Sequence, residues 1–355
     1  MRADDKRVIV LLISVILAVY IAGCAAEKPQ DDDQIKIGFM VDSLVIERWQ
    51  KDRDIFVAKA KELGAEVVVK NANENAELQS KQVRELVDMG VDVIVIIPYD
   101  KEDIGQALKQ AKRSGVKVIS YDRLARYGDV DAYLSFDNIE VGRLMGNALV
   151  EKVPEGNYVI INGSPKDNNS FMFNEGYMSA ISPKVTSGEI RIVKEIWAED
   201  WREIYAYNAV AELINEGVEI DGIIGGNDDL AEGTIKALLE RQLASQVIVV
   251  GHDGNLSACQ RIVEGTQYVT IYKPIKTLAQ KAAEIAWAMA IQGDAFDMSE
   301  QTDVLINDGE RDVPYVSVTP YLVTKDNLAE TVIKDGFHTK EEVYRNIPRD
   351  QWPED

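Results

Sequence analysis

Cysteine and histidine are scarce in this chain, and their scarcity excludes several kinds of site. The 355 residues include 2 Cys and 2 His, with no CxxC or HxxxH spacing among them. A zinc site needs closely spaced ligand pairs, and a disulfide framework needs more paired cysteines. We therefore expect no metal site and no disulfide framework, and the redox compartment stays undetermined.

Basic residues are also in deficit. Lysine and arginine number 39 against 60 aspartates and glutamates, which gives a formal net charge of -21 at pH 7. A field of that sign repels a phosphate backbone, so no nucleic-acid partner is expected. Hydrophobic residues make up 46% of the chain, and its length favours two globular domains with sizeable cores.

The sequence also lacks the common motifs of nucleotide-binding proteins and of serine hydrolases. No G-x-x-x-x-G-K-[ST] occurs, and no G-x-G-x-x-G follows the first apolar run of the body, which argues against nucleotide hydrolysis and a dinucleotide cofactor. Neither His252 nor His338 lies near a G-x-S-x-G turn, which argues against a serine hydrolase. We expect no cofactor and no catalytic residues. Glycoside hydrolysis by paired carboxylates stays open, because sequence cannot measure their separation.

The N-terminus holds one long apolar run. It extends from Val8 to Ile21 after a basic start and is followed by Ala-Gly and Cys24. This order is typical of a secretory signal peptide, and the run is shorter than the roughly 20 residues that span a bilayer as a helix. We expect residues 1–23 to be a signal peptide and residues 24–34 to be an acidic tether. The alternative is a plain signal peptide or an uncleaved anchor with an incidental cysteine.

The end of this run resembles the bacterial lipobox. The resemblance implies cleavage before Cys24, whose thiol would then carry diacylglycerol and tether the protein to the membrane. The mature protein is exported under either interpretation. We expect it in the cell envelope, on the outer face of the cytoplasmic membrane through its lipid anchor or in the periplasm.

From Ile35 onward, short β-branched runs alternate with longer helical patterns. The first four runs recur at roughly 25 to 30 residues, as a strand and its crossover helix demand, and four more follow a break near Ser135 to Asn138. The runs are IKIGFMV, AEVVVK, VDVIVII, VKVISY, NYVIIN, IRIVKEI, IDGIIGG and QVIVVG. This alternation predicts an α/β protein with two doubly wound parallel-sheet domains.

Polar residues gather after the carboxyl ends of these runs, where open α/β sheets bind their ligands. Each one alone is explained as well by helix capping. Carboxylates, guanidinium groups and carboxamides drawn from both sheets are better explained by a ligand rich in hydroxyls, with an aromatic ring covering its C–H face. The candidates are Arg48, Asp122, Arg123, Asp167, Asn169, Asn227 and Asp253, with Trp201 and Trp49 as aromatic candidates whose alternative is core burial.

Several segments together resemble one family. They are residues 47–56 (ERWQKDRDIF), 91–99 (VDVIVIIPY), 121–123 (YDR), 135–138 (SFDN), 163–169 (GSPKDNN), 265–275 (GTQYVTIYKPI) and 331–338 (TVIKDGFH). The chain resembles the pentose- and hexose-binding proteins of bacterial ABC transporters, in the ribose and galactose binding superfamily, and among them those that bind D-xylose. The resemblance implies contacts to a monosaccharide from Arg48, Asp122, Arg123, Asp167, Asn169, Trp201, Asn227, Asp253 and Lys273. Lys273 enters through the resemblance alone, since the residues around it are also explained by solvated surface.

The same resemblance implies a type I periplasmic binding protein fold with a three-segment hinge. One lobe would comprise residues 35–137 plus about 274–313, the other residues 138–273 plus about 314–344, with residues 345–355 as a tail. Hinge candidates are Ser135 to Asn138, Lys273 to Ile275 and the region from Val313 to Pro320. A ligand that contacts both lobes would drive their closure.

We therefore expect a monomeric binding protein, not an enzyme, that captures D-xylose or a related monosaccharide and delivers it to an ABC transporter permease. The alternative is a sugar-sensing component that docks on a membrane histidine kinase or chemoreceptor. A sugar-processing enzyme is a more remote alternative, and it would show product with time.

Overall fold

The computed structural model describes residues 34–45 and 47–353. The expected signal peptide, the lipidation site Cys24 and all of the expected tether except Gln34 lie outside the described residues. Residues from Ile35 onward form one compact unit. In the part of the chain that is described, no helix combines the length and the apolar character needed to cross a membrane.

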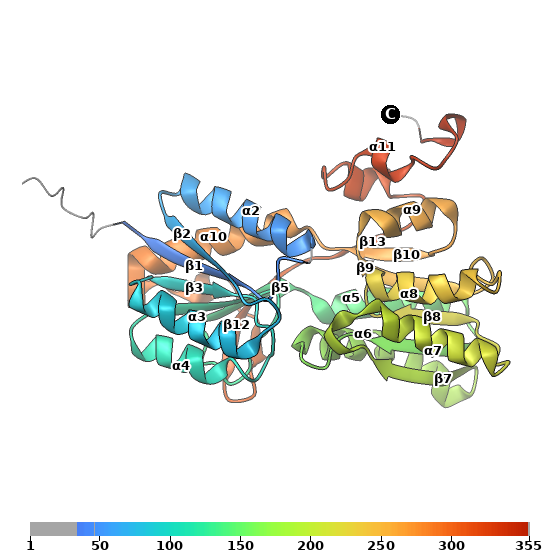
Figure 1. Ribbon diagram of the computed structural model, residues 1–355, viewed down its shortest axis with the longest axis horizontal. Helices are drawn as coiled ribbons and strands as arrows, with labels where there is room; N and C mark the ends of the chain where they lie inside the picture. The colour runs from blue at the N-terminus through green and yellow to red at the C-terminus, as the bar shows by residue number, and fades with distance from the viewer. Residues whose placement is uncertain (1–33, 46, 354–355) are drawn as a thin grey trace, which may run out of the picture. The chain divides into compact units, whose positions relative to one another are not determined.

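The first of two sheets has seven strands in the order β11-β12-β5-β4-β3-β1-β2 (Figure 1). All neighbours pair in parallel except β11 and β12. The strands are β1 (Lys36–Val41), β2 (Glu66–Asn71), β3 (Val93–Ile96), β4 (Lys117–Tyr121), β5 (Ala132–Phe136), β11 (Leu305–Asn307) and β12 (Asp312–Val318). The first four predicted runs are therefore confirmed as strands of one sheet.

The second sheet has six strands in the order β13-β10-β9-β8-β6-β7, again parallel apart from β13 at one edge. The strands are β6 (Gly156–Asn162), β7 (Ile190–Trp197), β8 (Gly222–Gly225), β9 (Ile248–Asp253), β10 (Val269–Tyr272) and β13 (Tyr321–Val323). The last four predicted runs are strands β6 to β9 of this sheet, and the prediction of two parallel α/β domains is confirmed.

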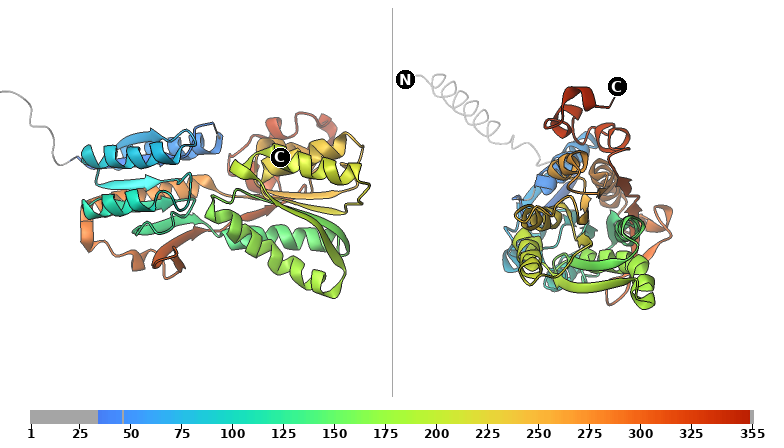
Figure 2. Two further views of the ribbon diagram at one scale, coloured as in Figure 1. Left: turned by 60° about the horizontal axis from the view of Figure 1, so that its bottom comes forward. Right: turned by 90° about the vertical axis from the view of Figure 1, so that its right-hand side faces the viewer.

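Helices cover both faces of the first sheet (Figures 1 and 2). They are α2 (Glu47–Glu62), α3 (Ala76–Asp88), α4 (Gly105–Arg113) and α10 (Ile275–Gln292). On one face Phe56 of α2 and Leu278 of α10 pack in one cluster with Phe39. On the other face Leu86 of α3 and Leu108 of α4 pack around Ile94. Burial of both faces explains why the strand sequences are continuous apolar runs rather than alternating ones.

The second sheet is covered in the same way. Its helices are α5 (Asn138–Lys152), α6 (Asn168–Ser187), α7 (Glu203–Asn215), α8 (Asp228–Leu239) and α9 (Leu256–Glu264). Helices α7 and α8 bury one face, while α5 and α6 bury the other. Helices α5 and α6 cross closely: a Cβ on Gly142 or on Gly176 would lie 2.1 Å from a backbone oxygen of the other helix. Glycine is required at both positions because no side chain fits there.

The C-terminal segment packs on α9. It contains a π-helical turn η4 (Ala329–Ile333), helix α11 (Lys340–Val343) and the 3₁₀ turn η5 (Arg349–Gln351). Val332 and Val343 bury their side chains against Cys259, whose free thiol is enclosed in this cluster. Trp352, in the expected tail, also packs here and donates a 2.9 Å hydrogen bond to the carbonyl of Ile347. Three further 3₁₀ turns are η1 (Glu199–Trp201), η2 (Gly293–Ala295) and η3 (Met298–Glu300).

The chain passes between the two sheets three times. The passages join β5 to α5, β10 to α10 and β12 to β13. The three passages fall at the hinge candidates around residues 135–138, 273–275 and 313–320, but the expected lobe boundary near residue 313 is placed too early. At the third, β12 pairs with β5 through Val318, so the chain leaves the first lobe after that residue rather than near residue 313. Residues 314–318 thus belong to the first lobe, because their ladder with β5 holds them there.

Candidate functional site

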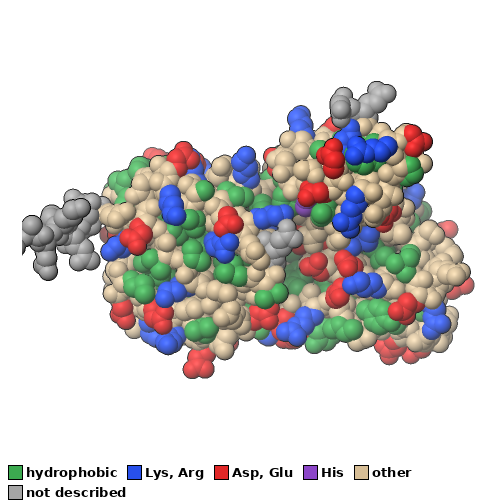
Figure 3. All heavy atoms as spheres, turned by 45° about the horizontal axis from the view of Figure 1, so that its top comes forward, with side chains coloured by type: hydrophobic (Ala, Val, Ile, Leu, Met, Phe, Trp, Pro, Cys, Tyr) green, Lys and Arg blue, Asp and Glu red, His purple; other side chains and the backbone are tan. Residues whose placement is uncertain are grey.

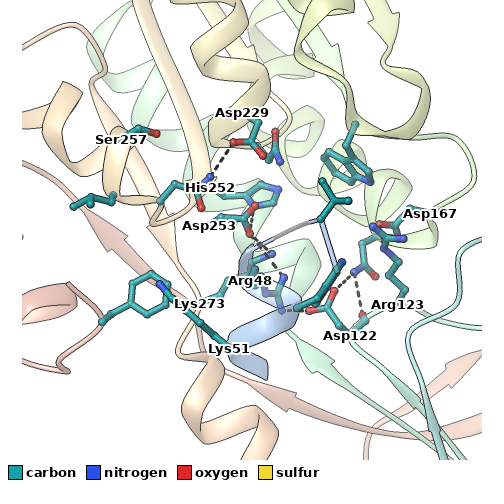
Figure 4. A pocket seen from close by; sticks show the side chains of 18 of the residues that line it. Arg48, Lys51, Asp122, Arg123, Asp167, Asp229, His252, Asp253, Ser257 and Lys273 are labelled. Carbon is teal, nitrogen blue, oxygen red and sulfur yellow. Dashed lines mark hydrogen bonds and ion pairs between the residues drawn. The ribbon is translucent and has the colours of Figure 1, made fainter. Parts of the chain in front are cut away.

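A cleft of about 650 Å³ lies where the carboxyl ends of the two sheets face each other. The molecular surface is hollowed at this place between the lobes (Figure 3). The structure brings together all nine sequence-predicted site residues in its lining, namely Arg48, Asp122, Arg123, Asp167, Asn169, Trp201, Asn227, Asp253 and Lys273. Several of them point toward one another across the cleft (Figure 4).

Arg48 stands in the first turn of α2 and is held by carboxylates. Its Nη2 donates to Oδ2 of Asp122, and its Nε lies 3.5 Å from Oδ2 of Asp52, one helical turn away. Asp52 is fully buried and accepts a hydrogen bond from the Tyr121 hydroxyl. Burial raises the pKa of Asp52 to about 6, although Arg48 and Tyr121 act in the opposite direction. Arg48 is therefore fixed from behind by a group that does not itself line the cleft.

Arg123 spans the two lobes. Its Nη1 donates to Oδ2 of Asp42 at 2.8 Å and to the carbonyl of Pro98 at 3.3 Å, while its Nε lies 2.9 Å from Oδ2 of Asp167 in the second lobe. Burial by itself would lower the pKa of Arg123, but these carboxylates raise it, so the guanidinium stays charged. The same burial raises the pKa of Asp42 and of Asp167. The preceding residue, Asp122, has a φ of 60°, which turns the chain sharply at the end of β4.

The start of α6 supplies Asp167 and Asn169 from the second lobe. Asp167 caps the helix, because its Oδ1 accepts the N–H of Asn169 at 2.9 Å. Nδ2 of Asn169 donates to the carbonyl oxygen of Asp122 at 3.0 Å, and its Oδ1 accepts from the Tyr133 hydroxyl at 2.9 Å. Asn227 likewise caps α8 through the N–H of Leu230. Capping and a place in the cleft thus coincide in these residues rather than compete.

Asp253, at the end of β9, is surrounded by three basic side chains. Its Oδ1 lies 2.7 Å from Nζ of Lys273, 3.2 Å from Nδ1 of His252 and 3.9 Å from Nη1 of Arg48. Burial alone would raise the pKa of Asp253, but Lys273, His252 and Arg48 outweigh that effect and hold it well below its ordinary value. Asp253 is therefore a buried carboxylate that stays ionised, and Lys273 is fixed by it in the cleft rather than solvated.

Aromatic rings form two walls of the cleft. Trp201 and Phe173 meet edge to face with ring centroids 6.3 Å apart, and the Trp201 ring covers Gly163, where a Cβ would lie 2.1 Å from it. Trp49 lines the opposite side, with the Arg48 guanidinium 4.5 Å from its ring centroid. Trp49 also belongs to the core under α2, so it packs in the core and lines the cleft at the same time. Such faces suit the C–H surface of a sugar ring.

A second group of contacts joins the lobes at the rim of the cleft. The Tyr99 hydroxyl, from the loop after β3, donates to Oδ1 of Asp200 at 3.1 Å. Nζ of Lys166 reaches the same carboxylate oxygen at 3.1 Å and the Tyr99 hydroxyl at 3.2 Å. The backbone N–H of Lys101 donates to the carbonyl of Lys166 at 2.9 Å. We call Tyr99, Lys101, Lys166 and Asp200 the rim contacts.

Sequence reasoning missed part of the lining. Phe173 follows Asn169 by one helical turn on α6, so the 3.6-residue period could have found it. His252 precedes Asp253 on β9 and has the appearance of a core residue in sequence. An outer part of the cleft, toward α9 and the C-terminal segment, had no sequence signal. It is lined by Lys51, Asn255, Ser257, Gln260, Phe337, His338 and Arg345.

The site is chemically a set of alternating donors and acceptors. Its carboxylates pair with arginine and lysine side chains, and within residues 34–45 and 47–353 no group of three or more His, Cys, Asp or Glu side chains could hold a metal ion. Ionised carboxylates accept hydroxyl protons, while guanidinium, ammonium and carboxamide groups donate to hydroxyl oxygens. This arrangement can hold a compact polyhydroxylated ligand without chemical change.

The comparisons with known sequences agree on one family. The family model described as the periplasmic binding protein domain matches residues 37–295. The D-xylose-binding periplasmic protein of Escherichia coli K12 is 42% identical over 339 residues, covering 95% of this chain and 99% of its own length. The protein of the same name from Haemophilus influenzae is 41% identical over 311 residues, covering 87% and 92%. These relatives are binding proteins, and this chain is likewise not an enzyme.

Solved structures of similar fold are solute-binding proteins. One from Clostridium phytofermentans, with bound β-D-glucose, has a TM-score of 0.79 and 26% identity, covering 87% of this chain and 99% of that one. Another from Chloroflexus aurantiacus, in complex with D-glucose, has a TM-score of 0.80 and 25% identity, covering 87% and 98%. With the two-lobed fold, the cleft and the family model in agreement, the chain belongs to the periplasmic binding protein family.

Proposed function

We propose that this protein captures D-xylose in the cleft between its lobes and delivers it to an ABC transporter. The observation that carries the proposal is the convergence of nine predicted contacts, drawn from both sheets, on a single cleft. The 42% identity to a D-xylose-binding protein along nearly the full length of both chains supports the choice of sugar.

The charges of the cleft suit a neutral sugar. Arg48, Arg123 and Lys273 are each paired with carboxylates of the protein, so none of these three positive charges is left for an anionic ligand to neutralise. A hydroxyl both donates and accepts, and it can join such a pair without breaking it. The Trp201 ring offers a flat apolar face beside these groups. Together they distinguish a sugar from an amino acid or a carboxylate.

Contacts between the lobes support a closing motion. Arg48 approaches Asp253, Arg123 pairs with Asp167, and Asn169 donates to the backbone of Asp122, in each case from one lobe to the other. A ligand held by the same residues binds the closed arrangement better than the open one, and so it shifts the population toward closure. The closed, loaded form is the one that a membrane permease would recognise.

Export and lipid anchoring at Cys24 complete the proposal. Both relatives above are periplasmic by name, and the N-terminal run ending at Cys24 has the order of a lipoprotein signal. In cells fed an alkyne-labelled fatty acid, the protein should become labelled, and a Cys24→Ser variant should not. Labelling of both forms equally would reject Cys24 as the site.

The main test is isothermal titration of residues 25–355, which include the whole compact unit, with D-xylose, D-ribose, L-arabinose, D-glucose and D-galactose. We expect saturable one-to-one binding of D-xylose in preference to the other sugars. An Asp253→Ala variant should bind at least about thirtyfold more weakly, because truncating one partner of a buried charge pair costs about 2–5 kcal/mol. The matched control is Asp294→Ala, since the side chain of Asp294 is fully exposed.

Each outcome is informative. Binding of another sugar with loss in Asp253→Ala would keep the site and reject D-xylose as its ligand. Folded, ligand-stripped protein that binds none of the five sugars would reject the proposed function. Conversion of the sugar with time would reject a pure binding role.

A further inference from the structure

His252 is a buried ionisable residue that lines the cleft and is not one of the nine predicted ligand contacts. It is the penultimate residue of β9, its side chain is 2% exposed, and it lines the cleft beside Asp253 (Figure 4). In the described part of the chain, neither of its ring nitrogens has a hydrogen-bond partner. Unpaired buried polar atoms are rare in folded proteins and cost free energy, so those of His252 require an explanation.

Aromatic packing fixes the ring. The imidazole centroid lies 4.3 Å from that of Phe173 and 6.2 Å from that of Trp201, and it meets Trp201 edge to face. The Trp201 Nε1 is likewise buried without a partner among the described residues. Nε2 of His252 and Nε1 of Trp201 thus lie on one wall of the cleft without a partner among the described residues, while Nδ1 of His252 faces Asp253. A ligand with several hydroxyls could pair with them, whereas an apolar ligand could not.

The neighbours of His252 decide which nitrogen carries the proton. Nδ1 lies 3.2 Å from Oδ1 of Asp253, whose position is held by Lys273 at 2.7 Å. A carboxylate at this distance favours a proton on Nδ1, and a small rotation of the ring would complete that hydrogen bond. Burial lowers the pKa of His252, so the imidazole is neutral near pH 7. Its Nε2 is then left as an acceptor with a free lone pair.

We propose that His252 is a further ligand contact, in which Nε2 accepts a hydrogen bond from one hydroxyl of the bound sugar. This inference rests on the proposed function and adds a determinant of specificity to it. The acceptor is neutral, and its ring packs against Phe173 on the aromatic wall while Nδ1 faces the charged Asp253. A sugar that lacks the matching hydroxyl leaves both partners unpaired in a buried site, which is the strongest form of discrimination.

The test uses isothermal titration of residues 25–355 in four forms: wild type, His252→Leu, His252→Gln and the control Tyr207→Phe. Tyr207 is partly exposed on α7, and its hydroxyl donates to the carboxylate of Glu240 at 3.0 Å, away from the cleft. We expect D-xylose to bind His252→Leu about tenfold more weakly, as loss of one buried hydrogen bond predicts. His252→Gln should lose less, because its carboxamide can still accept.

The decisive arm uses the four monodeoxy analogues of xylopyranose. For wild type, each missing hydroxyl should weaken binding. For His252→Leu, one analogue should bind as well as D-xylose itself, because the partner of its missing hydroxyl is already gone. Equal losses in wild type and His252→Leu for all four analogues would overturn the inference.

The outcomes distinguish failure of the His252 contact from failure of the proposed function on which it rests. Absence of D-xylose binding by wild type would reject the proposed function, and the role of His252 as a xylose contact would fall with it. Normal wild-type binding with unchanged affinity in His252→Leu would reject the role of His252 alone. If circular dichroism shows that His252→Leu is unfolded, the four analogues are titrated against His252→Gln. A reduced loss for one analogue supports the inference, and identical losses overturn it.

Discussion

Asp52 lies outside the cleft and yet sets the position of Arg48 inside it. Its carboxylate accepts from Tyr121 on one side and faces Nε of Arg48 on the other. We predict that Asp52→Asn, which replaces a carboxylate oxygen by an amide donor facing Arg48, weakens D-xylose binding about threefold to tenfold at pH 7.5. Titration at that pH measures the change, with Asp294→Ala as the control. Unchanged affinity would show that Asp122 alone positions Arg48.

The same carboxylate predicts a pH dependence of binding. Because burial raises the pKa of Asp52 to about 6, it is ionised at pH 7.5 and mostly protonated at pH 5. The attraction that holds Arg48 therefore weakens as the pH falls through 6. Affinity for D-xylose should be lower at pH 5 than at pH 7.5, and the Asp52→Asn variant should show a smaller difference. A difference as large in the variant as in wild type would assign the dependence to another group.

Gly163 determines where Trp201 stands. A Cβ at this position would lie 2.1 Å from the indole ring, so Gly163→Ala must displace the ring from the cleft wall. We predict a loss of about tenfold or more in D-xylose affinity with little change in thermal stability, since Trp201 is only partly buried. Titration and a thermal melt measure the two effects. A large fall in melting temperature without loss of affinity would contradict this role.

Among the secondary-structure elements, the loop after β3 and the turn after β7 meet at the rim contacts. The Tyr99 hydroxyl joins the two lobes there through Asp200. Removing it in Tyr99→Phe should shift the unliganded protein toward the open form and weaken sugar binding about threefold to tenfold, without touching a ligand contact. Small-angle scattering and titration would report the two effects. A more compact unliganded form would contradict the prediction.

Elements with a local sequence signal could be predicted, and those that depend on distant pairing could not. The eight apolar runs are strands β1 to β4 and β6 to β9, because parallel strands buried on both faces are continuous apolar stretches. Strand β5 is short and fell in the presumed break. Strand β12 contains Pro314, which argues against an inner strand, and its partner β5 lies far back in the chain.

In the candidate site too, residues with a local sequence signal could be predicted and the others could not. Strand ends pointed to seven of its nine predicted residues, because the topology of a doubly wound sheet places such positions at one edge, and Trp201 was chosen as an aromatic ring able to cover a sugar face. Lys273 follows a short strand and has no signal of its own, so only the family resemblance suggested it. His252 points inward from a strand, where a lone histidine has no sequence feature that separates a ligand contact from a core residue.

For the molecule as a whole, buried carboxylates predict how stability varies with pH. Burial raises the pKa of Asp228 to about 7 and that of Asp52 to about 6, above their ordinary value of 3.8. The folded state therefore holds more protons than the unfolded state between about pH 4 and pH 7, so the free energy of unfolding falls as the pH rises through that window.

We predict that unliganded protein is more stable at pH 5 than at pH 8 by about 1–3 kcal/mol. The net charge of -21 acts in the same direction, because its self-repulsion grows with pH. Below pH 4 the trend should reverse, since Asp253 has a pKa well below its ordinary value. Urea titrations across this range measure the curve. A free energy of unfolding that rises from pH 5 to pH 8 would show that folding does not raise the pKa values of Asp52 and Asp228.

The passage of β12 between β11 and β5 has a consequence for when the protein can fold. The first lobe lacks an inner strand until Asp312–Val318 is present, and the second lobe lacks β13 until a few residues later. Neither half of the chain is a complete folding unit, and both sheets close only when most of the polypeptide is available. The proposed export would therefore act on a chain in which neither sheet can be complete before residues 312–323 have been made.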